Sequence, residues 1–252
     1  MKPRKLMKKA ISALPTALAT ASLTLLLASC GAGDGGNANT ARPTGSAATD
    51  APDRSAGQKE QQTGEQSVQT EADLEAVTLR TGDLAEFPIT WMPILGSHVT
   101  AVTRPAACRP VESVRMGAFD PRPRASVRRY AAATTGEHLG SATSITLAAF
   151  SKADAVQIMA ELRDAVKDCT GDYDGGWTDT FTVRGLDPVD AGEQAVSFHL
   201  TGKSVVPMWY TVVRQGSVLV LFASTTLTGK DGQVPTPLVT RQITKLQAAA
   251  SG

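Results

Sequence analysis

The sequence predicts an α+β domain in which a mainly antiparallel sheet of about six strands carries two main helices. Six short runs are apolar or alternate between apolar and polar residues, as strands do, and several are separated by short glycine-containing turns. Only two long segments have the spacing of an amphipathic helix. The strands come in a run of two and a run of four, which favours an antiparallel sheet over repeated strand–helix–strand units.

Residues 1–29 are predicted to be a lipoprotein signal peptide. Five basic residues and no acidic residue precede an apolar run at 10–28, the pattern of a secretory signal. The run ends in Leu27-Ala28-Ser29-Cys30, which resembles a bacterial lipobox. We therefore expect lipid on Cys30 and a location on the outer face of the cytoplasmic membrane. A membrane-spanning helix is the alternative, because the run approaches the ~20 residues that cross a bilayer, but Pro15 and several hydroxyl residues favour the signal peptide.

Residues 30–72 are predicted to be the lipid anchor followed by a disordered linker. From residue 31 to 72 the only larger apolar residue is Val68, so this segment cannot bury enough apolar surface to offset its ordering entropy. Beyond residue 29 the chain has 20 basic and 24 acidic residues, a formal charge of −4, which argues against a nucleic-acid partner. Residues 73–252 are expected to form one domain.

The first part of this domain is expected to be irregular, with a short helical turn at 81–84. Next, Cys108, Val111 and Val114 follow one another at three-residue spacing, which predicts a short helix with one apolar face. Once Cys30 carries lipid, Cys108 and Cys169 are the two cysteines left, and we predict a disulfide between them in an oxidising compartment. Two free thiols or a metal pair are the alternative, although no Cys-x-x-Cys spacing or adjacent histidine supports a zinc site.

A hairpin is predicted at about 126–150, with a glycine-bounded turn at 135–140. It leads into the clearest helix, at 151–169, where Ser151 and Asp154 form a capping pattern. The apolar stripe of this helix is expected to comprise Val156, Met159, Leu162 and Val166, flanked by Ala155 and Ala165.

Four further strands are predicted at 179–186, 193–202, 205–215 and 217–226. Gln215-Gly216 is a compact turn signal between the last two. A final helix is expected with Thr236 as its cap and Pro237 at its first position. Leu238, Ile243 and Leu246 form the apolar side of that helix.

Three stretches carry a family resemblance: "ACRPV" around Cys108, "AAFSKADA" leading into a helix that ends in "AVKDC", and "GSVLVLFAS" before the last helix. Together they resemble the PknH-like extracellular sensor domains of actinobacteria, which occur on receptor kinases and on free-standing lipoproteins. The resemblance covers most of 76–249 and implies a cupped antiparallel sheet with a cleft for an unidentified extracellular ligand. The kinase-attached domains typically carry two disulfides, whereas this sequence allows one. No kinase region lies in this sequence, so a signalling role would need a partner.

Candidate ligand-binding residues lie in the predicted strands. If the sheet is cupped, alternate residues could line its concave face as an apolar floor with a few polar groups. The candidates are Arg128, Tyr130, His199, Trp209 and Tyr210. The other reading is that the aromatic residues pack under the helices.

No catalytic residue, metal site or cofactor is predicted. The sequence contains no nucleophile elbow, zinc-protease motif or phosphate loop. His138 beside Glu137 is read as a solvated turn rather than a catalytic pair. The aspartates at 172, 174 and 179 could hold calcium loosely, but residue twelve counted from Asp172 is Val183, which excludes an EF-hand.

The expected function is therefore that of a non-enzymatic, membrane-anchored extracytoplasmic binding or sensor domain for an envelope ligand. The alternative is an interaction protein that docks on a membrane or cell-wall partner such as a receptor kinase. A wall hydrolase or esterase with a dispersed catalytic site is a third hypothesis.

Overall fold

The computed structural model describes residues 70–93, 102–176, 179–227 and 232–251. All of them belong to one unit, Lys59–Gly252. The predicted signal peptide, Cys30, His98 and nearly all of the predicted linker lie outside the described residues. Among the helices within these ranges, none is both long enough and apolar enough to cross a membrane.

Within these ranges, one antiparallel sheet of eight strands organises the fold, in the order β1-β2-β3-β8-β7-β6-β5-β4. The strands are β1 (Ile89–Trp91), β2 (Ala125–Ala132), β3 (Ser141–Ala149), β4 (Asp172–Asp174), β5 (Thr180–Leu186), β6 (Gln194–Gly202), β7 (Met208–Gln215) and β8 (Val218–Thr226). The predicted α+β class with one antiparallel sheet is confirmed. The predicted number of six strands is wrong, because the three-residue strands β1 and β4 were not foreseen.

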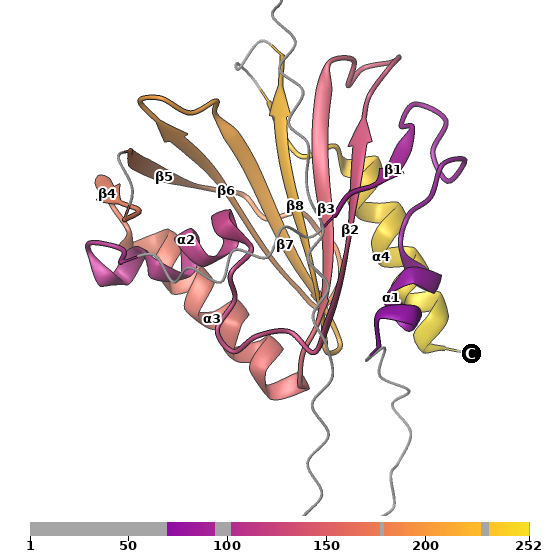
Figure 1. The fold of residues 1–252 in the computed structure, drawn as a ribbon, viewed down its shortest axis with the longest axis horizontal. Helices are drawn as coiled ribbons and strands as arrows, with labels where there is room; N and C mark the ends of the chain where they lie inside the picture. Colours follow the sequence, from indigo (N-terminus) through magenta and orange to yellow (C-terminus); the bar gives the residue numbers. More distant parts are fainter. Residues whose placement is uncertain (1–69, 94–101, 177–178, 228–231, 252) are drawn as a thin grey trace, which may run out of the picture. The chain divides into compact units, whose positions relative to one another are not determined.

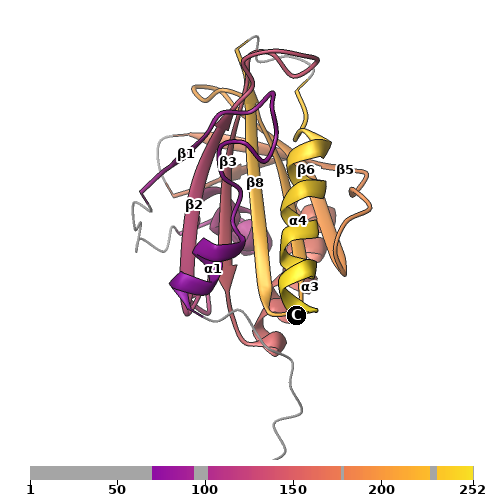
Figure 2. The ribbon, with the colours of Figure 1, turned by 90° about the vertical axis from the view of Figure 1, so that its right-hand side faces the viewer.

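The helices cover both faces of the sheet (Figure 1). They are α1 (Glu71–Val77), α2 (Arg109–Met116), α3 (Lys152–Asp168) and α4 (Thr236–Ala250). A 3-10 turn, Ala106–Cys108, precedes α2. The pair α2 and α3 lies on one face, and α1 and α4 lie on the other, as the view in Figure 2 shows from the side of α4.

The lead-in to the sheet differs from the prediction. Its helix is α1, which begins at Glu71, two residues before the expected start of the domain, and residues 81–84 form turns instead. A capping box explains where α1 begins: the amide of Asp73 donates to Thr70 Oγ1 at 3.1 Å, and the amide of Thr70 donates to Asp73 Oδ2 at 3.0 Å. Leu74 and Val77 anchor α1 in the core.

Helix α3 has the predicted cap, since Ser151 Oγ accepts from the amide of Asp154 at 3.0 Å. Its buried face, however, includes Ile158 and not Val156, which is 40% exposed. The predicted stripe was therefore partly wrong. At 100° per residue, Ile158 shares the face of Ala155 and Leu162, whereas Val156 points away from it.

Helix α4 does not have the predicted cap. Thr236 is its first helical residue, Pro237 falls in its first turn, and the capping position belongs to Pro235, which makes no side-chain capping bond. The apolar side is as predicted, with Leu238, Ile243 and Leu246 buried.

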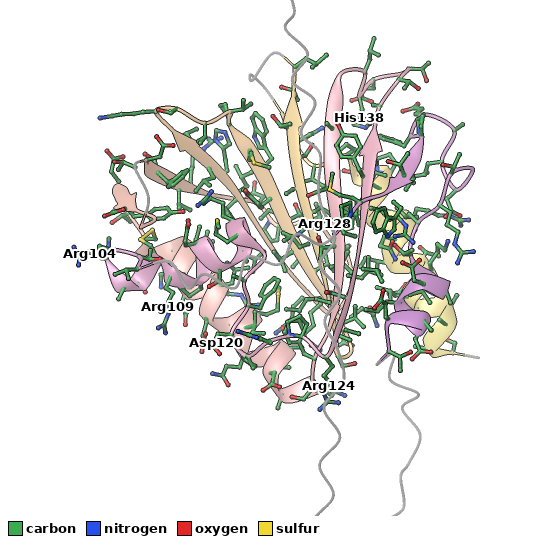
Figure 3. All side chains as sticks on the ribbon, in the orientation of Figure 1. Arg104, Arg109, Asp120, Arg124, Arg128 and His138 are labelled. Atoms are coloured by element: carbon green, nitrogen blue, oxygen red, sulfur yellow. A yellow bond between two sulfur atoms is a disulfide. The ribbon has the colours of Figure 1, made fainter. Side chains whose placement is uncertain are left out.

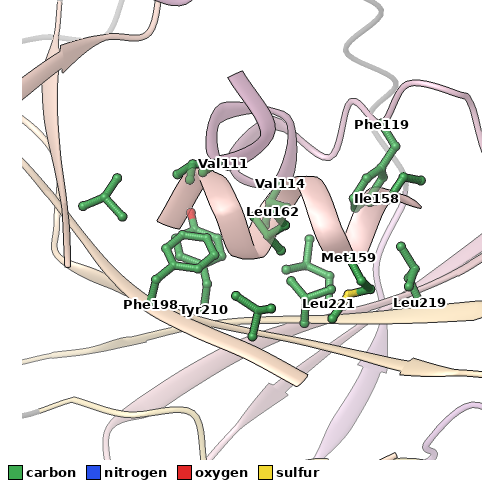
Figure 4. Close-up of a cluster of buried hydrophobic side chains, with 14 of the residues drawn as sticks. Val111, Val114, Phe119, Ile158, Met159, Leu162, Phe198, Tyr210, Leu219 and Leu221 are labelled. Atoms are coloured by element: carbon green, nitrogen blue, oxygen red, sulfur yellow. The ribbon is translucent and has the colours of Figure 1, made fainter. Parts of the chain in front are cut away.

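The predicted disulfide between Cys108 and Cys169 is confirmed, with their Cα atoms 5.1 Å apart. It joins the start of α2 to the end of α3. These two helices also pack on the sheet through a shared core. Its members include Val111, Val114, Phe119, Ile158, Met159, Leu162, Phe198, Tyr210, Leu219 and Leu221 (Figure 4). The disulfide and this core together hold α2 over the sheet.

Candidate ligand-binding pocket

A pocket of about 210 Å³ lies between the end of α2 and the sheet. Its size is below the ~300–1,000 Å³ of typical ligand pockets, so it suits a small molecule or one end of a longer one. The residues that line it come from the end of α2, from strands β2, β3, β5, β6, β7 and β8, and from the β6–β7 connection: Val114, Arg115, Met116, Gly117, Arg128, Ser144, Thr146, Phe181, Leu200, Val205, Val206, Met208, Tyr210, Leu221 and Ala223.

Strand register builds the floor of the pocket. Arg128 lies opposite Thr146, and Thr146 lies opposite Leu221. One step further along the same face, Ser144 and Ala223 are paired, and Ala223 faces Tyr210. Side chains two residues apart on a strand share a face, so this floor is a continuous patch across four strands.

The five predicted site residues are divided between the two faces of the sheet. Arg128 and Tyr210 line the pocket. Tyr130 lies on the same face as Arg128, two residues along β2, but it is not among the lining residues. His199 and Trp209 lie on the opposite face, where Trp209 belongs to the core under α1 and α4. The five residues therefore do not form one site.

His199 and Trp209 stack on each other, with ring centroids 4.6 Å apart. Within the described part of the chain, the buried His199 Nε2 has no hydrogen-bond partner. Burial, with a smaller contribution from the positive charge of Arg184, lowers the pKa of His199. This pair is a packed contact on the face away from the pocket.

Tyr210 is buried in the pocket floor. Its ring stacks on Phe198 with centroids 4.9 Å apart, and its hydroxyl donates to Met208 Sδ at 3.4 Å. Burial raises its pKa well above the ordinary value, so the phenol stays neutral. Tyr210 thus contributes a flat, largely apolar surface.

Arg115 lines the pocket with its charge already balanced. Its guanidinium donates to both carboxylate oxygens of Glu112, at 2.5 and 2.8 Å, and lies 4.5 Å from the ring centroid of Phe181. The hydroxyl of Tyr173 donates to the same carboxylate at 3.0 Å. The Glu112 contact raises the pKa of Arg115, and burial, followed by the charge of Glu112, raises that of Tyr173.

The sequence did not single out Glu112. It stands beside Val111 on a short amphipathic helix, where a glutamate is normally exposed. Here it is 2% exposed. The only signal that could have identified it is the glutamate–arginine spacing of three along the helix, which places Arg115 within reach.

Arg128 lines the pocket without a carboxylate partner among the described residues. It is half-buried, and its Nε donates to Thr146 Oγ1 at 3.1 Å. A Cβ atom added to Gly117 would lie 3.2 Å from Arg128 Nη2, so the guanidinium sits against the end of α2. Arg128 is labelled over the sheet in Figure 3, beside α2. Burial lowers the pKa of Arg128.

The described residues contain no group of three or more histidine, cysteine, aspartate or glutamate side chains placed to hold a metal ion. Asp172 and Asp174 make local hydrogen bonds: Asp172 accepts from Thr182 Oγ1 at 2.6 Å and Asp174 from the amide of Gly176 at 2.8 Å. His138 lies in the β2–β3 turn, its ring 5.9 Å from that of Phe87.

No known protein-family model matches the sequence, and the search of curated proteins gave no match. Among solved structures, the chain is similar to the extracellular domain of PknH from Mycobacterium tuberculosis, at 14% identity and a TM-score of 0.49, over 75% of this chain and 99% of that one. It is also similar to an uncharacterized Mycobacterium smegmatis protein, an Rv0999 ortholog, at 15% identity and a TM-score of 0.35, over 71% and 93%. The expected resemblance to a PknH-like extracellular domain is thus found again among solved structures.

Proposed function

We propose that this chain is a lipid-anchored extracytoplasmic protein whose folded unit binds a small envelope ligand without catalysing a reaction. The observation that carries the proposal is the pocket over the sheet, in which the partly desolvated Arg128 lies among mostly apolar lining residues. A small number of polar groups in an apolar pocket is the usual composition of a ligand site. The lipobox-like segment ending at Cys30 supports the anchored location.

A native-ligand experiment tests the proposal. The full chain is purified from its own cell envelope, and any molecules that stay bound are released and identified by mass spectrometry. We expect a retained small molecule, and we expect Ala223→Leu, which adds volume inside the pocket, to lose it. Ala160→Leu, on the exposed side of α3, is the matched control and should keep it.

The opposite result would contradict the proposal: no retained molecule, and no change in melting temperature when envelope extract is added. Membrane crosslinking then tests the rival function, docking on a membrane or cell-wall partner such as a receptor kinase. A reproducible partner whose crosslinking is unaffected by Ala223→Leu would favour that rival.

A further inference from the structure

Among the described arginines that are buried or half-buried, Arg128 is the one whose charge is not paired with a carboxylate. Among the described residues, four arginines are buried or half-buried, and three of them pair with a carboxylate: Arg115 with Glu112, Arg129 with Glu75, and Arg214 with Glu193. Arg128 is the fourth. Within the described ranges no carboxylate forms an ion pair with it, and the one hydrogen-bond partner of its guanidinium is the neutral hydroxyl of Thr146.

The surroundings of Arg128 balance its charge only in part. The carbonyl end of α2 lies beside its guanidinium at Gly117. A helix C-terminus is equivalent to roughly half a negative charge at most. Since Arg115 and Glu112 cancel, the pocket as a whole keeps a net positive charge. A partly desolvated cation without a counter-charge is unfavourable, and an anion placed beside it relieves that cost.

The rest of the pocket is mainly apolar. Its apolar lining includes Met116, Val205, Val206, Met208, Leu221 and Ala223. Val206 lines the pocket and is nevertheless 58% exposed, so the pocket reaches the surface at this residue. One additional polar group, the hydroxyl of Ser144, lies on the floor beside Thr146. A ligand that complements this arrangement has a charged end and an apolar body.

We propose that the ligand is a small amphipathic oxyanion, whose carboxylate or phosphate group binds the Arg128 guanidinium and whose apolar body lies against Met116, Met208 and Leu221. This inference rests on the proposed function, because it names the chemical class of the molecule held in the same pocket. The planar guanidinium presents parallel N–H groups to an oxyanion. The pocket volume restricts the enclosed part to a short chain or a small ring.

The test compares ligands of one shape and different charge. The full chain is held in nanodiscs of neutral phospholipid and titrated calorimetrically with octanoate, octyl phosphate and the uncharged octanamide, after subtraction of empty nanodiscs. Because a hydrogen bond to a charged group contributes more than a neutral one, we expect octanoate or octyl phosphate to bind about tenfold to a hundredfold more tightly than octanamide. The stronger of the two anions identifies the head group.

Variants then assign the effect to Arg128. Arg128→Gln should remove the preference for the anion and leave the affinity for octanamide unchanged, which also shows that the variant is folded. Arg128→Lys should retain part of the preference, because it keeps the charge but loses the planar fork. Arg109→Gln is the control: this exposed arginine begins α2 and lies away from Arg128 in Figure 3. It should leave all affinities unchanged.

The outcomes separate the two proposals. If octanamide binds as tightly as the anions, or if Arg128→Gln leaves anion binding unchanged, the pocket binds small molecules but the oxyanion inference is wrong. If none of the three molecules binds, the oxyanion inference is wrong, whereas a molecule retained in the native-ligand experiment and lost in Ala223→Leu would still support the proposed function. A hundredfold preference that Arg109→Gln also abolishes would likewise overturn the assignment to Arg128.

Discussion

Two arginines line the same pocket, and their different roles follow from a single neighbouring side chain. Glu112 neutralises Arg115 and also accepts from Tyr173, so these three residues tie α2 to strand β4. Arg128 has no such neighbour within the described residues. At the residue scale, Arg115 is thus part of the contact between α2 and β4, whereas Arg128 lines the pocket with only Thr146 bonded to its guanidinium among the described residues.

Replacing Glu112 with glutamine should destabilise the fold markedly. The change leaves Arg115 without its counter-charge and weakens the bond to Tyr173, and removing one partner of a buried ion pair costs about 3 kcal/mol. Urea denaturation of the full chain measures the loss. Glu161→Gln, which affects an exposed hydrogen bond with Gln157 on α3, should stay within about 0.5 kcal/mol of the wild type. Equal midpoints for the two variants would show that the Glu112 network is not structural.

His199 should make stability depend on pH. Its pKa is lowered from 6.5 in the folded protein, mainly by burial. Between this folded pKa and 6.5, the unfolded chain therefore binds more protons than the folded protein. The contribution of His199 to stability is complete above pH 6.5 and is lost as the pH falls from 6.5 through the folded pKa. We expect His199→Gln to reduce the drop in unfolding free energy between about pH 7.5 and about pH 5.5. At the higher pH, the difference in unfolding free energy between His199→Gln and the wild type reports packing alone. If the variant shows the same drop between the two pH values as the wild type, His199 is ruled out as its source.

Alternation along a strand explains which site residues could be predicted from the sequence. Trp209 and Tyr210 are adjacent on β7, so they had to point to opposite faces, and only one of them could line a pocket. His199 and Phe198 point to opposite faces for the same reason. The sequence did not show which of the two alternating sets of side chains in each strand lies on the side of α2. That depends on the pairing of β7 with β8 and of β8 with β3.

At the scale of elements, the two caps expected from hydroxyl residues turned out differently. Ser151 caps α3 with an observed side-chain bond, whereas Thr236 lies inside α4 and caps nothing. Ser151→Ala should therefore cost about 1 kcal/mol of unfolding free energy, and Ser151→Asp should restore most of it. Thermal or urea unfolding gives both values. Thr236→Ala is the matched comparison, and a loss there as large as at Ser151 would contradict these assignments.

The disulfide should be the strongest single link between elements. It closes a span of 61 residues between Cys108 and Cys169, for which the chain-entropy model gives about 4 kcal/mol. We expect the double variant Cys108→Ala/Cys169→Ala to lower the unfolding free energy by a large part of this amount. A reducing agent should shift the wild type in the same direction and leave the double variant unchanged. If the reductant shifts both proteins equally, the effect does not come from this bond.

Element length decided which parts of the fold could be predicted. The six longer strands and the helices α2, α3 and α4 have enough periodic residues to be recognised. By contrast, β1 and β4 have three residues each, too few to show alternation. Strand β4 also lies within a run of aspartates and glycines that is typical of a turn. Its place in the sheet depends on tertiary contacts, among them the bridge between Arg104 and Asp174.

At the scale of the whole folded unit, one sheet separates two hydrophobic cores and contributes residues to both. Leu221 points into the core under α2 and α3, while its neighbour Val220 points into the core under α1 and α4. The central strands therefore cannot lose one face without disturbing the other. This architecture favours unfolding in a single cooperative transition.

Core variants on either face test that cooperativity. Leu162→Ala in α3 and Leu238→Ala in α4 should each cost about 2–5 kcal/mol. Each should shift the transition by the same amount in far-ultraviolet circular dichroism and in tryptophan fluorescence. With Trp91 and Trp177 replaced by phenylalanine, the fluorescence reports Trp209, which lies on the α4 face. A fluorescence transition that Leu162→Ala does not shift would then mean that the two faces unfold separately.

Helices α1 and α4 are locked to each other on the face opposite the pocket. Gln242 accepts from the amide of Leu79 and donates to the carbonyl of Val77, both at 3.0 Å, and Lys245 Nζ donates to the carbonyl of Thr78 at 2.9 Å. Helices α1 and α4 thus lie together on the face of the sheet opposite the pocket. A biosensor chip or a fluorescent fusion partner joined beyond the end of α4 would therefore leave the pocket on the α2 face free to receive its ligand.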